Sequence, residues 1–400
     1  MANRIMLNQT SYHGAGAIAE IVNEAKAHDY KKAFVCSDPD LIKFQVSTKV
    51  TDLLDQAGLS YEIYSNIKAN PTIENVQTGV AAFKKSGADY IIAIGGGSSM
   101  DTAKAIGIII ANPEFEDVRS LEGVAPTRKP CVPIIAVPTT AGTAAEVTIN
   151  YVITDVERKR KFVCVDPHDM PIIAVVDPEM MSSMPKGLTA STGMDALTHA
   201  IEAYIGRSTT KQTRAASIEA IQLIFDNLQT AYKNGNNKTA RRNMLRASYL
   251  AGTAFTKSYV GYVHAVAHSL GGCYGIPHGL ANSVLLPIVL EAYGTAAHKK
   301  LARLARITGI SDSKLDAVAA EEFINHIRSM NISMNIPETL DGIRNEDIPK
   351  LACYADKEAN PLYPVPALWG PEKLEQMYHL VQEVSEHDRN RNSEHPGKAA

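Results

Sequence analysis

The chain has 400 residues, of which 45% are hydrophobic and 21% charged, and this balance excludes wholesale disorder or a fibrous repeat. Its length exceeds the size at which a single hydrophobic core usually keeps growing, so two domains are expected. A formal net charge of -3 with intermixed signs provides no basic stripe for a phosphate backbone, which excludes a typical nucleic-acid binder and favours small-molecule ligands.

The cysteines and the opening residues indicate the cellular compartment in which the protein is expected. The five cysteines are odd in number, scattered and never in a C-x-x-C pair, so we interpret them as reduced core thiols. They are Cys36, Cys131, Cys164, Cys273 and Cys353. The opening M-A-N-R-I-M-L-N lacks the apolar stretch of a signal peptide, and the most apolar run, 106–111, is too short to span a bilayer. A cytoplasmic protein with no membrane partner is therefore expected.

Up to about Pro185, short β-branched runs alternate with amphipathic stretches, which is the pattern of a parallel sheet covered by helices. An early strand is expected at Arg4 to Gln9, where an open edge could pair with a second subunit and form a homodimer. Further strands are expected at 32–37, 61–64, 90–94, 132–137 and 172–176, with helices such as 45–57 and 75–85 between them. The pattern predicts a Rossmann-like α/β domain.

A glycine-rich segment, I-G-G-G-S-S-M-D at residues 94–101, follows one of these strands and opens a helical stretch. Its backbone N–H groups can approach an anion, and a helix N-terminus adds roughly half a positive charge, so a pyrophosphate could bind there. The alternative is a plain turn in which Ser98 or Asp101 caps the helix. The spacing does not match G-x-G-x-x-G, and the acidic candidate, Asp38, ends an earlier strand and could merely cap the turn before Pro39.

A second polar segment, V-P-T-T-A-G-T-A-A-E-V at residues 137–147, follows the next strand. Its threonines could hydrogen-bond a phosphate or a ribose, or the segment could be a capped helix start. Two further runs between Thr148 and Asp166 flank the charged E-R-K-R, and they predict a β-hairpin with a solvent-facing loop.

After Pro185 the β-branched runs become rare. Apolar residues recur at helical spacing in three stretches, 196–205, 213–232 and 239–255. We therefore expect an α/β domain over residues 1–185, whose polar segments could hold a dinucleotide phosphate, and an all-helical domain over residues 186–384. Residues 385–400 offer almost nothing to bury and are expected to form a disordered polar tail.

A cluster of histidines and one aspartate is the strongest signal in this helical half. Asp195 and His199 are four residues apart, so they project from the same helix face. The stretch V-H-A-V-A-H-S-L-G-G-C-Y-G-I-P-H-G adds His264, His268 and His278. Neutral imidazoles with a carboxylate suit a divalent transition metal, although any single histidine could instead be a hydrogen-bonded core residue. A metal needs three or four protein ligands, and spacing alone leaves five candidates.

With these residues in view, the chain resembles the iron-containing (group III) alcohol dehydrogenases from about Asn3 to Tyr378. The most specific matches are the histidine segment and the strings GGGSSMDTAKAIG, PEFEDVRSLEG, VPTTAGTAAEVTINYVITD and RKFVCVDPHDMP. The resemblance implies a metal-dependent, NAD(H)-linked enzyme that interconverts a small hydroxy-aldehyde and its diol. It also implies that the metal polarises the carbonyl as a Lewis acid and that the nicotinamide provides the hydride.

The same resemblance implies roles for individual residues. The positions that match the family's metal ligands are Asp195, His199, His264 and His278, and His268 matches the catalytic histidine beside the metal and the nicotinamide. The positions that match cofactor contacts are Asp38, Asn70, Gly96, Gly97, Ser98, Asp101, Thr139, Thr140, Thr143 and Lys161. Among them, Asp38 matches the residue that faces the adenine ribose. Asn150 and Phe255 fall where the family lines its substrate pocket.

Several alternatives stay open at this point. The donor set accepts Fe²⁺ or Zn²⁺. The Lys357-Glu358 pair stands where the best-known members have smaller residues, so 1,3-propanediol or another short-chain alcohol remains a candidate substrate. A lyase of the dehydroquinate synthase type would need basic residues for a substrate phosphate, and residues 264–278 contain no Lys or Arg. A non-catalytic metal or nucleotide sensor would keep the ligands without turnover.

Overall fold

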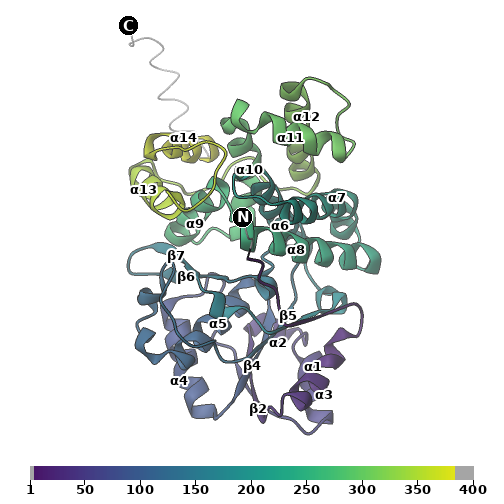
Figure 1. The fold of residues 1–400 in the computed structure, drawn as a ribbon, viewed down its shortest axis with the longest axis vertical. Helices are drawn as coiled ribbons and strands as arrows, with labels where there is room; N and C mark the ends of the chain where they lie inside the picture. The colour runs from purple at the N-terminus through teal and green to yellow at the C-terminus, as the bar shows by residue number, and fades with distance from the viewer. Residues whose placement is uncertain (1–3, 383–400) are drawn as a thin grey trace.

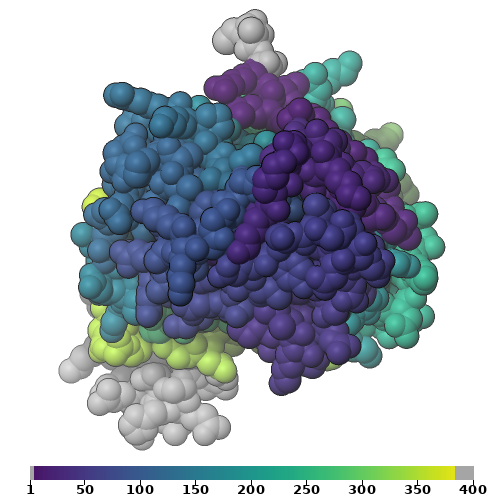
Figure 2. All heavy atoms as spheres, turned by 90° about the horizontal axis from the view of Figure 1, so that it is seen from below, coloured from purple at the N-terminus to yellow at the C-terminus, as the bar shows by residue number. Residues whose placement is uncertain are grey.

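The computed structural model describes residues 4–382, so the polar tail expected at residues 385–400 lies outside the described residues. The chain forms an α/β part in its first half and a helical part in its second half, stacked along the long axis of the molecule (Figure 1). Viewed from below, the first half covers most of the surface, and the second half shows mainly at the margins (Figure 2). The expected fold class, α/β plus all-α, is confirmed.

Six parallel strands form the central sheet, in the order β1-β8-β5-β4-β2-β3. Their bounds are β1 Thr10–His13, β2 Lys32–Ser37, β3 Ser60–Tyr64, β4 Tyr90–Gly95, β5 Ile134–Pro138 and β8 Ile173–Val176. The chain runs from β2 outward to β3 and then crosses back to β4 on the other side of β2. In open α/β sheets, ligands bind beyond the carboxyl ends of the strands at such a reversal of strand order. The topology therefore places a binding site beyond β2 and β4.

Helices connect these strands and cover both faces of the sheet. Their bounds are α1 Glu20–Ala27, α2 Pro39–Lys43, α3 Thr48–Gln56, α4 Ile73–Ser86 and α5 Gly97–Ala111. Alternate side chains of each strand enter opposite clusters, with Phe34 and Ile91 in one and Val35 and Ile92 in the other. Because both faces are buried, the strands are nearly continuous apolar runs, as is typical of a parallel sheet.

The second half consists of helices joined by loops, and one large apolar cluster fills its interior. Their bounds are α6 Lys186–Ile205, α7 Lys211–Lys233, α8 Lys238–Ser258, α9 Tyr262–Tyr274, α10 His278–Tyr293, α11 Thr295–Ile307, α12 Asp316–Ser333, α13 Ile348–Ala359 and α14 Pro371–Val381. Among the described residues, no single helix is long and apolar enough to cross a membrane, whereas α10 and α11, bent by 117°, reach that length and hydropathy only as a pair.

A β-hairpin joins the two halves. It consists of β6, Asn150–Asp155, and β7, Arg160–Val165, paired antiparallel as expected, and its connecting residues are exposed. The hairpin contacts α5 of the first half and α9 of the second. The approach to α9 is very close, because a Cβ built on Gly272 would lie 2.5 Å from the backbone nitrogen of Lys161. Only a residue without a side chain fits at this contact.

We expect Gly272→Ala to lower the free energy of unfolding by about 1–3 kcal/mol, because the added Cβ must displace the hairpin backbone. Gly187→Ala in α6 is the matched control: no atom lies within 4 Å of a Cβ built there, and alanine favours a helix over glycine. Urea titration measures both variants. An unchanged midpoint for Gly272→Ala would contradict the contact between the hairpin and α9.

Two expectations about local structure are wrong. The early strand is not at Arg4 to Gln9 but begins at Thr10, and Ile5 and Leu7 are each 53% exposed, so neither residue reaches the core. The segment at residues 137–147 is not the start of an α-helix; it is a loop that contains a short 3₁₀ turn. The remaining strands begin and end within two residues of their expected bounds.

Candidate metal and nucleotide site

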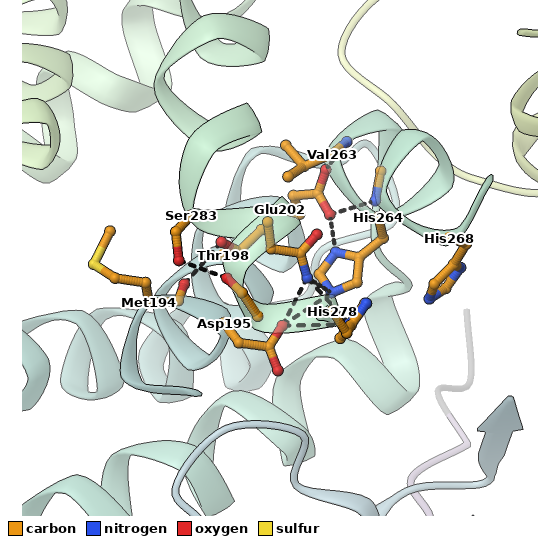
Figure 3. A network of polar contacts seen from close by, with 12 residues as sticks. Met194, Asp195, Thr198, Glu202, Val263, His264, His268, His278 and Ser283 are labelled. Carbon is orange, nitrogen blue, oxygen red and sulfur yellow. Dashed lines mark hydrogen bonds and ion pairs between the residues drawn. The ribbon is translucent and has the colours of Figure 1, made fainter. Parts of the chain in front are cut away.

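Three helices bring four potential metal ligands together. Helix α6 is buried on nearly all sides, so its polar residues need partners inside the protein. Asp195 and His199 lie one turn apart on α6, while His264 on α9 and His278 at the start of α10 come from the other two helices. One atom from each residue lies within 4.8 Å of those from the other three, and Asp195, His264 and His278 converge in Figure 3.

Burial keeps the three histidines neutral, which leaves each ring with a lone pair to donate. Burial lowers the pKa of His199 to about 3 and holds the pKa values of His264 and His278 well below their usual range. The pKa of Asp195 is raised by burial, and the neighbouring His199 opposes that shift. Three neutral imidazoles and one carboxylate are a donor set for Fe²⁺ or Zn²⁺.

The geometry of the cluster also fits a metal. In a tetrahedral site, ligand atoms about 2.0–2.2 Å from the ion lie about 3.3–3.6 Å from one another, so these four atoms, all within 4.8 Å of one another, would close by up to about an ångström around a bound ion. Within the part of the chain that the structure describes, the buried Nδ1 of His199 has no hydrogen-bond partner.

A buried carboxylate that the sequence analysis missed orients one of these histidines. Glu202 on α6 accepts a hydrogen bond from Nδ1 of His264 at 2.6 Å (Figure 3). The same carboxylate accepts from the backbone N–H groups of Gly261 and Val263 at 2.8 and 2.9 Å, at the N-terminus of α9. Burial raises the pKa of Glu202 to about 7, although these N–H donors oppose the shift. With its hydrogen on Nδ1, His264 presents Nε2 to the cluster.

An amide side chain, also missed, lies among the ligand atoms. Asn282 on α10 is fully buried, and its Nδ2 lies 2.7 Å from Oδ1 of Asp195. The same nitrogen lies 3.2 Å from Nε2 of His264 and 3.1 Å from Nε2 of His278. Helical spacing could have revealed both missed residues, because Glu202 follows Asp195 by seven positions and Asn282 follows His278 by four.

One cavity of about 1160 Å³ joins this cluster to the carboxyl ends of the sheet strands. All ten expected cofactor residues line it, together with His268 and the two expected substrate-pocket residues, Asn150 and Phe255. Apolar side chains that no sequence motif marks as part of a binding site complete the wall of the cavity. Among them are Ile67, Val152, Val163 and Leu188. The cavity lies beyond β2 and β4, where the topology predicts a dinucleotide site.

The glycine loop leads into an uncapped helix N-terminus. Helix α5 begins at Gly97, and among the described residues no side chain accepts a hydrogen bond from the backbone N–H groups of residues 97–99. Free N–H groups and the helix dipole together attract an anion. The alternative of a cap from Ser98 or Asp101 is wrong. Asp101 lies one turn inside the helix, where its Oδ2 accepts from the backbone N–H of Val152 in the hairpin at 3.1 Å, and burial raises its pKa to about 6.

The threonines of the second polar segment lie directly against this loop. A Cβ built on Gly96 would lie 3.0 Å from Oγ1 of Thr140, and one built on Gly97 would lie 2.9 Å from Cγ2 of Thr143. The backbone N–H of Thr139 donates to the carbonyl of β4's last residue at 3.0 Å. Hydroxyl groups therefore surround the uncapped helix end, where a phosphate can accept their hydrogen bonds.

A buried lysine faces the cavity from the hairpin. Nζ of Lys161 donates to Oδ1 of Asn70 at 2.7 Å, and the backbone of Asn70 is left-handed with φ of 59°. Burial lowers the pKa of Lys161 to about 8, and the nearby Asp101 opposes that shift. An ammonium and an amide held side by side can donate hydrogen bonds to the hydroxyl groups of a ribose.

Asp38 has two roles at the end of β2. Its Oδ1 accepts from the backbone N–H of Leu41 at 3.0 Å, so the alternative in which it caps the turn before Pro39 is confirmed for this oxygen. The residue also lines the cavity. Burial raises the pKa of Asp38, while the backbone N–H of Leu41 lowers it. Asp38 therefore both caps a helix and lines the cavity.

His268 lies beside the ligand cluster rather than within it. Its ring stacks on that of His278, with 5.1 Å between centroids, but its Nδ1 donates to Oε1 of Glu358 at 2.7 Å. Figure 3 shows it to one side of His264 and His278. Phe255 stacks on another ligand, His199, with 4.2 Å between centroids. Both His268 and Phe255 line the cavity.

Comparisons with known proteins agree with this geometry. The chain matches the family model described as iron-containing alcohol dehydrogenase over residues 8–178. Residues 189–380 match the model of the Fe-containing alcohol dehydrogenase family, C-terminal. Together the two models span most of both halves of the fold, and only cavity-lining residues between positions 179 and 188 lie outside the matched ranges.

Individual relatives lead to the same family. Lactaldehyde reductase of Escherichia coli (strain K12) is 49% identical over 358 residues, which cover 88% of this chain and 92% of the relative. NAD-dependent methanol dehydrogenase of Bacillus methanolicus is 40% identical over 342 residues, covering 85% and 89%. A crystal structure of 1,3-propanediol oxidoreductase is similar with a TM-score of 0.89 at 37% identity, covering 95% of this chain and 99% of that one. The chain is an oxidoreductase and belongs to the iron-containing alcohol dehydrogenase family.

Proposed function

We propose that this enzyme reduces lactaldehyde to 1,2-propanediol with NADH, and that it oxidises the diol when NAD⁺ is in excess. The observation that supports the proposal most is the single cavity that joins an uncapped helix N-terminus to four clustered metal-binding side chains. A metal-dependent hydride transfer needs a dinucleotide and a metal in one site. The 49% identity to a lactaldehyde reductase favours a hydroxy-aldehyde as the substrate.

Protein groups for both cofactors are present in the cavity. We propose that Fe²⁺ is held by Asp195, His199, His264 and His278; Zn²⁺ suits the same donors, so availability decides between them. For NAD, the pyrophosphate would be held by Gly96, Gly97, Ser98, Thr139, Thr140 and Thr143, and the rest of the cofactor by Asp38, Asn70, Asp101 and Lys161. When bound, the metal supplies a Lewis acid that polarises the carbonyl, and NADH supplies the hydride.

Reduction of an aldehyde by NADH also consumes one proton, which we assign to His268. Its Nδ1–H is engaged by Glu358, so Nε2 gives the proton to the new alcohol oxygen from the imidazolium form, which leaves a neutral ring with its hydrogen on Nδ1. In diol oxidation the same atom takes the proton back. Phe255 supplies an apolar wall against His199, and Asn150 lines the same cavity, where its side chain can hydrogen-bond a substrate hydroxyl.

A panel of aldehydes tests the substrate. Iron-loaded protein, purified anaerobically, is mixed with NADH and either lactaldehyde, 3-hydroxypropanal or a simple short-chain aldehyde, and NADH oxidation is followed by absorbance. We expect kcat/KM for lactaldehyde to exceed the other values by about tenfold or more. A difference of this size is typical when one group of a competing substrate does not fit the pocket. A higher value for 3-hydroxypropanal would identify a 1,3-propanediol dehydrogenase instead. No NADH oxidation with any aldehyde would contradict the proposed function.

Asp38 is expected to select NAD over NADP. Its free carboxylate oxygen can accept hydrogen bonds from the adenosine ribose, whereas a 2′-phosphate would place like charge against it. Two unit charges about 4 Å apart at an effective dielectric of about 20 interact by roughly 4 kcal/mol, and even half of that is a preference of more than tenfold. We therefore expect Asp38→Gly to gain NADPH activity and to lose some affinity for NADH.

The matched variant for this prediction is Asp38→Asn, which keeps the size of the side chain and the cap on Leu41 but removes the charge. Both variants should raise the ratio of kcat/KM for NADPH to that for NADH, and Asp38→Asn should do so without loss of stability. If wild type used both cofactors equally, or if neither variant changed the ratio, Asp38 would have no role in selectivity.

The proposal also covers the domain organisation, the oligomeric state and the cellular compartment of the protein. We propose a dinucleotide domain at residues 1–185, a catalytic domain at residues 186–384, and a cytoplasmic homodimer. The described β1 pairs only with β8, so one edge of the sheet is open to a second copy. All five cysteines are free, which fits a reducing compartment. Light scattering after size exclusion tests the dimer, and the mass of one 43.3 kDa chain would overturn it.

A further inference from the structure

One carboxylate behind the cavity wall holds two residues that line it. Oε1 of Glu358, near the end of α13, accepts from Nδ1 of His268 at 2.7 Å and from the phenol of Tyr363 at 2.8 Å. His268 and Tyr363 line the cavity, whereas Glu358 lies behind them with its side chain 14% exposed. The two donors come from α9 and from the loop after α13, so one oxygen atom connects two separate parts of the wall.

The chemistry of this contact determines which nitrogen of His268 carries hydrogen. An ionised carboxylate can only accept, so the hydrogen of the 2.7 Å contact belongs to Nδ1 of the ring. The other nitrogen, Nε2, is then free to exchange a proton on the cavity side. Stacking on His278, with ring planes 18° apart, further restricts the ring. Without Glu358, no other described group accepts from Nδ1, and either nitrogen could carry the hydrogen.

We propose that Glu358 is a positioning residue for proton transfer: through its contact with Nδ1 it fixes the tautomer and orientation of His268, so that Nε2 faces the substrate end of the cavity. Tyr363 holds the carboxylate in place from its other side. This inference rests on the proposed function, in which His268 exchanges a proton with the substrate oxygen.

A double-mutant cycle tests the proposal in the iron-loaded enzyme. Glu358→Ala is expected to lower kcat by about tenfold to a hundredfold, with KM for NADH and metal content unchanged. In a His268→Ala background the same change should lower kcat no further, because Glu358 acts only through that ring. Additive losses, or an unchanged kcat in Glu358→Ala, would overturn the proposal.

Three further variants distinguish an effect on the position of the His268 ring from an effect on the stability of the protein. Lys357→Ala is the matched control, because Lys357 is the exposed neighbour on the same helix, and its kcat should equal that of wild type. Glu358→Gln keeps an oxygen that can accept from Nδ1, so it should retain more activity than Glu358→Ala at equal thermal stability. Tyr363→Phe leaves the contact with His268 intact and should lose less than Glu358→Ala. An equal loss in Tyr363→Phe would assign the effect to the phenol and contradict our proposal.

A readout without turnover distinguishes failure of this inference from failure of the proposed function. In zinc-loaded protein carrying ¹⁵N-labelled histidine, the ring nitrogens of His268 are assigned by comparison with His268→Ala. We expect Nδ1 to be protonated in wild type and to lose much of that protonation in Glu358→Ala. An unprotonated Nδ1 in wild type, or an identical spectrum in Glu358→Ala, would overturn the role of Glu358 whether or not the enzyme reduces any aldehyde.

Discussion

Replacing His199 or His278 by alanine is expected to deprive the purified protein of most of its metal and, with it, of nearly all turnover. Each supplies one of the four donors that the described residues bring within 4.8 Å of one another, and a set of three binds the metal more weakly and leaves an extra open position. A metal that polarises a carbonyl contributes several kcal/mol to the transition state, so we expect kcat to fall by about a thousandfold or more. Metal content by plasma mass spectrometry and NADH oxidation under anaerobic conditions measure both effects.

Controls separate metal loss from misfolding. Asp195→Asn removes the charge of the fourth donor without changing its size, so it should also lose metal while keeping the thermal stability of the metal-free protein. His379→Ala removes an exposed histidine on α14 and should change neither quantity. Full metal content together with a wild-type rate in His199→Ala or His278→Ala would show that this cluster is not the metal site.

His268→Ala is expected to behave differently, because this residue lies beside the cluster and donates to Glu358 instead. The metal should stay, and kcat should fall by roughly 10²–10⁴-fold, the contribution that is typical of a general acid. KM for NADH should change little. The assays are those used for the ligand variants, so the two classes of histidine are compared directly.

The comparison with His264→Ala decides whether the roles of the two α9 histidines are assigned correctly. His264 is oriented by Glu202 at 2.6 Å, so its loss should release the metal. If His268→Ala lost the metal while His264→Ala kept it, the two assignments would have to be exchanged. If His268→Ala kept both metal and kcat, another group would have to supply the proton.

Local periodicity explains how much of this site the sequence predicts. Asp195 and His199 are one helical turn apart, and His264 and His268 are likewise, so their spacing alone places each pair on one face of a helix. The glycine segment is recognisable because a strand precedes it and a helix follows it. These features depend on neighbours within a few residues, which the chain itself specifies.

Contacts between distant segments explain what the sequence does not predict. His264 meets Glu202 across 62 positions and His268 meets Glu358 across 90, and no spacing rule connects residues that far apart. Spacing along the sequence therefore cannot decide which of the five candidate residues bind the metal, whereas the structure places His268 outside the group that the other four form. The early strand is misplaced by the sequence pattern for the same reason, because its register is set by parallel pairing with β8, more than a hundred residues later.

Reversible removal of the metal tests the central claim, a metal-dependent reduction of an aldehyde by NADH, most directly. Wild-type protein is stripped with a chelator, assayed with NADH and lactaldehyde under anaerobic conditions, and assayed again after stepwise addition of Fe²⁺. We predict that the stripped protein is inactive and that activity returns in proportion to bound iron, up to one ion per chain. A metal-free protein that oxidises NADH at the full rate would contradict this account, as would an iron-loaded protein that oxidises no NADH.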